Sequence, residues 1–86
     1  MKIRVVMMGR HYHETEGLPE FLELPEPASL DDALDRLGEL MSPGKGFPGS
    51  CLIAVSGKHL GTIASHSVAP LRDGDELMLL APVAGG

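Results

Sequence analysis

Residues 72–83 read "RDGDELMLLAPV", and this stretch decides the fold because a tight turn leads directly into an apolar strand. Gly74 between two aspartates is typical of a β-turn. The segment that follows, 77–83, is predicted to be the last strand, and Gly85 and Gly86 come after it. The fold then depends on which earlier strand lies beside this one.

Earlier segments also have the character of strands. "KIRVVMM" (2–8) alternates between two faces, and "FLEL" (21–24) alternates as well and can pair with it as a hairpin. "SCLIAV" (50–55) is a short, near-continuous apolar run between turn residues, which predicts a buried strand. A turn is expected at 56–58, and a further short strand near "HLGTIA" (59–64) is an open alternative.

The clearest helix is "SLDDALDRLGELM" (29–41). Ser29 is a good N-cap, and the aspartates at 31 and 32 lie near the positive end of the helix dipole. Gly38 weakens the helix by about 1 kcal/mol relative to alanine. The sequence "SPGKGFPG" (42–49) cannot continue a helix. The apolar positions repeat at helical spacing: Leu30, Ala33, Leu34, Leu37, Leu40 and Met41.

This order of elements predicts an α+β fold. One amphipathic helix can cover a small mixed sheet, with the first and last strands parallel and side by side and the helix in the crossover. That is the β-grasp arrangement of ubiquitin-like proteins. We expect residues 1–86 to form a single domain with an extended Gly-Gly tail at about 82–86.

Composition narrows the class of protein. The net charge is −5, with one Tyr and two Phe, which makes nucleic acid an unfavourable ligand and basic protein surfaces better candidates. Cys51 is the only cysteine, so no internal disulfide is possible. The N-terminus lacks the features of a signal peptide, and no stretch approaches the length of a membrane span. A cytoplasmic protein without a membrane partner is expected.

The stretch "APLRDGDELMLLAPVAGG" (69–86) resembles the end of the MoaD/ThiS family of ubiquitin-like sulfur carriers. In that family a similar aspartate-glycine-aspartate turn precedes a strand and a terminal glycine pair. "LELPEPASLDDAL" (22–34) resembles the family's second strand and helix start, and the ending "PVAGG" is closer to MoaD than to the thiamine-pathway carriers. The chain departs from MoaD in its first and last strands, where Met7, Met8, Leu79 and Leu80 replace phenylalanines, and in a longer stretch between Gly57 and Pro70.

The resemblance implies that Gly86 carries sulfur. A separate adenylyltransferase of the ubiquitin-activating type, MoeB/ThiF-like, would use ATP to convert the terminal carboxylate into an acyl-adenylate. Conversion to a thiocarboxylate would follow, with a cysteine desulfurase or rhodanese as sulfur source. A MoaD-like carrier would deliver the sulfur to a pterin precursor on a MoaE-like large subunit of molybdopterin synthase, and the carrier itself would bind no cofactor.

The tail has the composition that this chemistry requires. A carboxylate is a poor electrophile, so it has to be activated inside another protein's active site. Gly85 and Gly86 have no Cβ and can thread a narrow channel, while Pro82 restricts Ala81 to an extended conformation. The residues expected in the partner's channel are Pro82, Val83, Ala84 and Gly85.

Alternation in the first and last strands suggests a second feature, an outward apolar patch that docks the partner. Its expected members are Val6, Met8, Met78 and Leu80, with Leu60 at the rim. The competing interpretation is that both faces of these strands are buried, as is common for parallel strands.

Other motifs carry less weight. His11 and His13, beside Glu14 and Glu16, lie in one loop that is more simply solvated than metal-bound, so no metal site is predicted. Cys51 could hold a persulfide but is more simply a buried, inert thiol. The sequence "GELMSPGKG" (38–46) has the wrong spacing for a phosphate-binding loop.

A chain that ends in Gly85 and Gly86 is compatible with several functions. Within sulfur transfer, the chain could serve thiamine, tRNA thiolation or cysteine synthesis instead of molybdopterin. A ubiquitin-like modifier would form an isopeptide bond between Gly86 and a lysine. A β-grasp binding module with a tail of no function is the third class.

Overall fold

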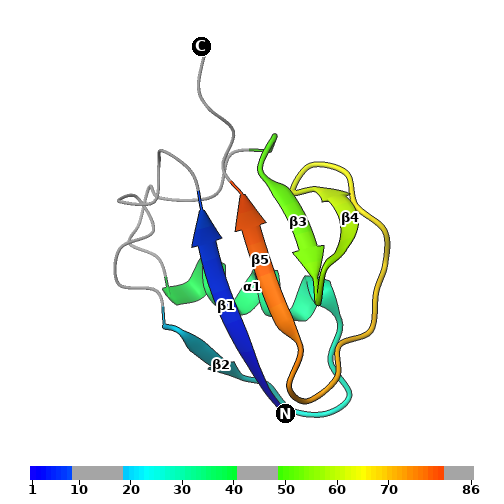
Figure 1. The fold of residues 1–86 in the computed structure, drawn as a ribbon. Coiled ribbons are helices and arrows are strands. Elements are labelled where there is room, and N and C mark those ends of the chain that lie inside the picture. Colours follow the sequence, from blue (N-terminus) through cyan, green and yellow to red (C-terminus); the bar gives the residue numbers. More distant parts are fainter. Residues whose placement is uncertain (9–18, 41–48, 81–86) are drawn as a thin grey trace.

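In the computed structural model, residues 1–8, 19–40 and 49–80 are described. They form a five-stranded sheet with one helix lying across one face (Figure 1). The elements in chain order are β1 (Lys2–Met8), β2 (Phe21–Glu23), α1 (Leu30–Leu40), β3 (Leu52–Val55), β4 (Lys58–Thr62) and β5 (Glu76–Leu80).

The strand order is β2-β1-β5-β3-β4, so the last strand is the centre of the sheet. β5 runs parallel to β1 and antiparallel to β3, while β1–β2 and β3–β4 are antiparallel pairs. A mixed sheet with a parallel central pair and a single crossover helix is the β-grasp fold, which confirms the expected fold class.

Helix α1 begins where the sequence predicts. The backbone N–H of Ser29 donates to the Asp32 carboxylate at 2.8 Å, and the N–H of Asp32 donates to Ser29 Oγ at 3.3 Å. This reciprocal pair satisfies two N–H groups at the helix start. The helix is described as far as Leu40, and residues 41–48, which include most of the breaker segment 42–49, lie outside the described residues.

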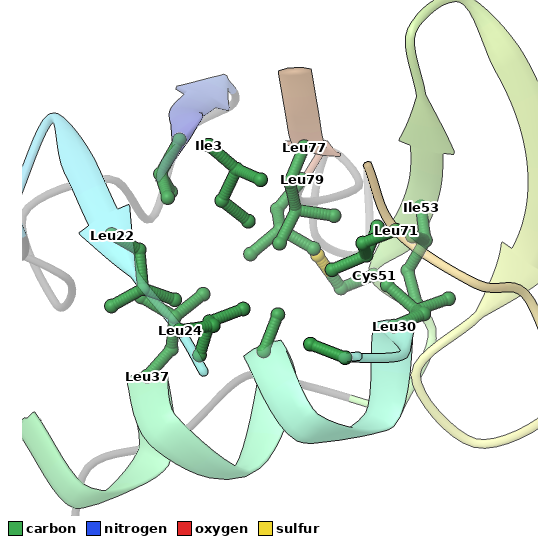
Figure 2. Close-up of a cluster of buried hydrophobic side chains, with 13 residues drawn as sticks. Ile3, Leu22, Leu24, Leu30, Leu37, Cys51, Ile53, Leu71, Leu77 and Leu79 are labelled. Carbon is green, nitrogen blue, oxygen red and sulfur yellow. The ribbon is translucent and has the colours of Figure 1, made fainter. Parts of the chain in front are cut away.

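The core lies between α1 and the sheet (Figure 2). Ile3 and Val5 of β1 and Leu77 and Leu79 of β5 face the helix, as alternation along each strand requires. The buried side chains of this core cluster are Ile3, Val5, Leu22, Leu24, Ala28, Leu30, Ala33, Leu37, Cys51, Ile53, Leu71, Leu77 and Leu79. Ala54, at 7% exposed, is also buried but is not a member of this cluster.

The turn before β5 joins three parts of the fold. Asp73 accepts from the N–H of Lys2 at 2.7 Å, and the N–H of Gly74 donates to the Lys2 carbonyl at 2.8 Å. Asp75 accepts from the hydroxyl of Ser56 at 2.9 Å and from the N–H of Arg72 at 2.8 Å. The aspartates of this motif therefore tie the start of β1 and the β3–β4 turn to the start of β5.

Candidate functional site

The face of the sheet opposite α1 is the candidate site, because its apolar end lies where β5 leads into the tail. Parallel pairing places Val6 opposite Met78 and Met8 opposite Leu80. Met8 is 48% exposed and Leu80 is 36% exposed, while Val6 and Met78 are half-buried. The sequence predicted this grouping of four side chains on one face.

Two residues of β3 extend this surface, and the sequence prediction missed both. Leu52 pairs with Leu80, and Ala54 pairs with Met78. Leu52 is 40% exposed, although the apolar run of β3 predicted a buried strand. We call the six side chains the outer apolar face; it comprises a row of Met8, Leu80 and Leu52 and a row of Val6, Met78 and Ala54.

Leu60 does not belong to this face, contrary to its expected position at the rim. On the neighbouring strand β3, Ile53 pairs with Gly61 and Ala54 pairs with His59. Leu60 lies between these two β4 residues and has no pairing partner on β3, so it is the extra residue of a β-bulge. Its side chain is half-buried and packs against the core cluster. The bulge thus turns Leu60 toward the core and leaves His59 as the β4 residue beside Ala54.

The other end of the same face is charged. Arg4 pairs with Glu76 across β1 and β5, and the Arg4 guanidinium lies 3.7 Å from the Glu20 carboxylate. The Lys2 ammonium lies 4.6 Å from the centre of the Phe21 ring. The exposed aliphatic side chains of this face, Met8, Leu52 and Leu80, therefore lie at the end of the sheet from which the tail departs. The Phe21 ring, which is 46% exposed, lies at the charged end beside the Lys2 ammonium.

The tail residues named by the sequence, Pro82, Val83, Ala84, Gly85 and Gly86, lie outside the described residues. Their attachment point is described: residue 81 follows Leu80, the last residue of the central strand. An extended chain spans about 3.3–3.6 Å per residue, so six residues reach at most about 22 Å from Leu80. A protein that acts on Gly86 must place its reaction centre within that distance of the outer apolar face.

Cys51 has the environment of a structural thiol. It is fully buried, and burial raises its pKa, although a hydrogen bond from the Leu80 backbone opposes the shift. A buried protonated thiol is a poor nucleophile. The geometry favours the inert thiol over a persulfide carrier.

His66 joins the segment after β4 to the start of α1. Its Nε2 lies 2.8 Å from Asp31 Oδ1, and its Nδ1 lies 2.8 Å from the Thr62 carbonyl oxygen. The hydrogen bond to Asp31, followed by that to Thr62, raises the pKa of His66. Both partners are acceptors, so both ring nitrogens donate only in the imidazolium form.

Within residues 1–8, 19–40 and 49–80, no three His, Cys, Asp or Glu side chains are grouped as metal ligands. The loop that contains His11, His13, Glu14 and Glu16 lies outside these ranges. In the same part of the chain, no helix has the length and apolar character needed to cross a membrane.

Comparison with known proteins gives one match. A family model described as the ThiS family matches residues 8–86, which includes the outer apolar face from Met8 onward and the whole tail. No curated protein and no solved structure matches the chain.

Proposed function

Because the chain belongs to the ThiS family, we propose that its reacting atom is the carboxyl carbon of Gly86. The family is one of sulfur carriers, and the match extends through the tail to residue 86. That match is the observation that carries the proposal. The family also implies a ThiF/MoeB-like activating enzyme as partner.

The proposed reaction has three steps. The Gly86 carboxylate attacks the α-phosphorus of ATP, which gives an acyl-adenylate and releases pyrophosphate. The terminal sulfur of a persulfide, supplied by a cysteine desulfurase or rhodanese, then attacks the carbonyl carbon and displaces AMP, which leaves an acyl disulfide with the donor cysteine. A second thiol attacks the sulfur of that cysteine, forms a disulfide with it and releases the thiocarboxylate. ATP belongs to the activating enzyme in this scheme, and the carrier supplies the tail and the docking surface.

The outer apolar face is the proposed docking surface for that enzyme. Its exposed side chains, Met8, Leu52 and Leu80, form one row at the end of the sheet nearest the tail. Contiguous exposed apolar side chains commonly mark interaction sites. The short reach of the tail supports the same surface, since an enzyme that holds Gly86 has to cover this end of the sheet.

The proposal also concerns the biosynthetic pathway that receives the sulfur. The matched family carries the name ThiS, which favours thiamine synthesis. The ending "PVAGG" resembles MoaD, which favours molybdopterin synthase and a MoaE-like large subunit as the second candidate. A strain without the gene distinguishes the two: a thiamine requirement with normal molybdoenzyme activity supports the first, and the reverse supports the second.

Mass spectrometry tests the carrier function itself. Protein isolated from its own cells should contain a fraction in which sulfur replaces one oxygen of Gly86. Incubation with the ThiF/MoeB-like enzyme and ATP should give the acyl-adenylate, and deletion of Gly86 should abolish it without changing the thermal unfolding midpoint. Normal adenylation of the deleted chain would refute the proposal, and isopeptide adducts on lysines without any thiocarboxylate would indicate a protein modifier.

A further inference from the structure

The outer apolar face contains a small hollow over Ala54. Its volume is about 20 Å³, enough for one methyl-sized group. The hollow lies between β3, β4 and β5, and its lining residues are Leu52, Ile53, Ala54, His59, Met78 and Leu80.

The hollow exists because a small side chain lies among larger ones. In its row across the sheet, Ala54 lies between Met78 on β5 and His59 on β4. Leu52 and Leu80 close the hollow on the side toward the tail. The bulge between Ile53 and Ala54 contributes, because it brings His59 rather than Leu60 opposite Ala54.

The position of the hollow indicates what covers it. Leu80, which lines the hollow, directly precedes the six-residue tail, so an enzyme that holds Gly86 lies over this part of the sheet. Among the residues that the structure describes, no Asp, Glu, Lys or Arg lines the hollow. An aliphatic group therefore fits it better than a charged one, which would lose its hydration without a partner.

We propose that the activating enzyme inserts one aliphatic side chain into the hollow over Ala54, and that the small size of Ala54 determines which enzyme the carrier accepts. This inference rests on the proposed function. Selection here is by shape, since a carrier with a larger residue at this position would exclude the inserted side chain.

The test fills the hollow while leaving the charge and the tail unchanged. Ala54→Leu should weaken binding of the ThiF/MoeB-like enzyme at least tenfold, measured by calorimetry, and reduce the adenylation rate at limiting enzyme to a similar extent. Ala54→Ser keeps the hollow open and should bind within about twofold of the wild type. Ala64→Leu is the matched control, because it adds the same side chain at an exposed position outside the hollow.

The outcomes separate the two proposals. If the wild type neither binds the enzyme nor is adenylated, the proposed function and this inference are both wrong. If the wild type is adenylated and Ala54→Leu binds equally well or more tightly, only the inserted side chain is refuted. Circular dichroism checks folding; if Ala54→Leu unfolds, Ala54→Val takes its place, with at least threefold weaker binding expected and unchanged binding refuting the inference.

Discussion

Leu79 and Leu80 are neighbours on β5 and face opposite sides of the sheet. Leu79 is 0% exposed in the core cluster, whereas Leu80 is 36% exposed on the outer apolar face. Replacing each by aspartate makes the same chemical change on the two faces. We expect Leu79→Asp to unfold the protein and Leu80→Asp to leave it folded but unable to bind its partner tightly.

The magnitudes follow from burial. A fully buried leucine contributes about 1.5–3 kcal/mol, and an unpaired polar group buried in its place costs several kcal/mol more. A domain of this size has a free energy of unfolding of only about 4–13 kcal/mol, so Leu79→Asp removes most or all of it. About two-thirds of Leu80 is covered in the free protein, so Leu80→Asp should cost about 1–2 kcal/mol while its carboxylate reaches water.

Binding should respond more strongly than folding to the change at Leu80. A docked partner covers the remaining exposed part of the leucine, and with aspartate it would have to desolvate a carboxylate instead. A loss of at least about 1.4 kcal/mol corresponds to tenfold weaker binding, and we expect no less.

Urea unfolding followed by circular dichroism gives the stabilities, and calorimetry with the activating enzyme gives the affinities. Unfolding of Leu80→Asp would show that this side chain belongs to the core. A folded Leu80→Asp protein with unchanged affinity would place docking elsewhere on the surface. A stable Leu79→Asp protein would contradict the described packing of β5 against α1.

Three further predictions concern the fold. Gly38 lies in α1 with nothing within 4 Å of an added Cβ, so Gly38→Ala should raise stability by about 0.5–1 kcal/mol in urea unfolding; a decrease would show an unrecognised contact. Gly61 has φ of +124°, and an added Cβ would meet the Ser65 carbonyl and lie 2.9 Å from His66 Cα. Gly61→Ala should therefore lower the melting temperature by several degrees or more, and an unchanged melting temperature would refute this reasoning. The pKa of His66 is raised in the folded state, so its stabilisation is complete below about pH 6.5 and is lost as pH rises through the folded value. His66→Gln should therefore destabilise the protein more at pH 5.5 than at pH 8.5 in urea unfolding, and an equal loss at both pH values would rule out the charged bond to Asp31.

The sequence predicted much of this fold because its periodicities are strong. The helix was expected at 29–41 and is observed at Leu30–Leu40, with Ser29 as its cap. The last strand was expected at 77–83, and its described part, Glu76–Leu80, pairs with β1 in the expected parallel orientation. The bounds of the helix and of the last strand follow from the local pattern of apolar residues. The parallel orientation of β5 beside β1 follows from the connection between them, which contains the single crossover helix.

The surface from β3 could not be predicted in the same way. The run of 50–55 is apolar on both sides, so alternation does not reveal that Leu52 and Ala54 face outward. Their role depends on the position of β3 beside β5, a tertiary feature. The misplacement of Leu60 has a similar cause, because the bulge that turns it inward is set by pairing across two strands.

The central place of β5 has a mechanical consequence. The tail is attached to a strand that is hydrogen-bonded along both edges, to β1 and to β3. A pull on the tail along the strand loads these bonds in shear, so they share the force, whereas bonds in a strand that is peeled from one end break one after another. An enzyme that draws the tail into its active site can therefore exert traction on the carrier without extracting the strand that holds its core together.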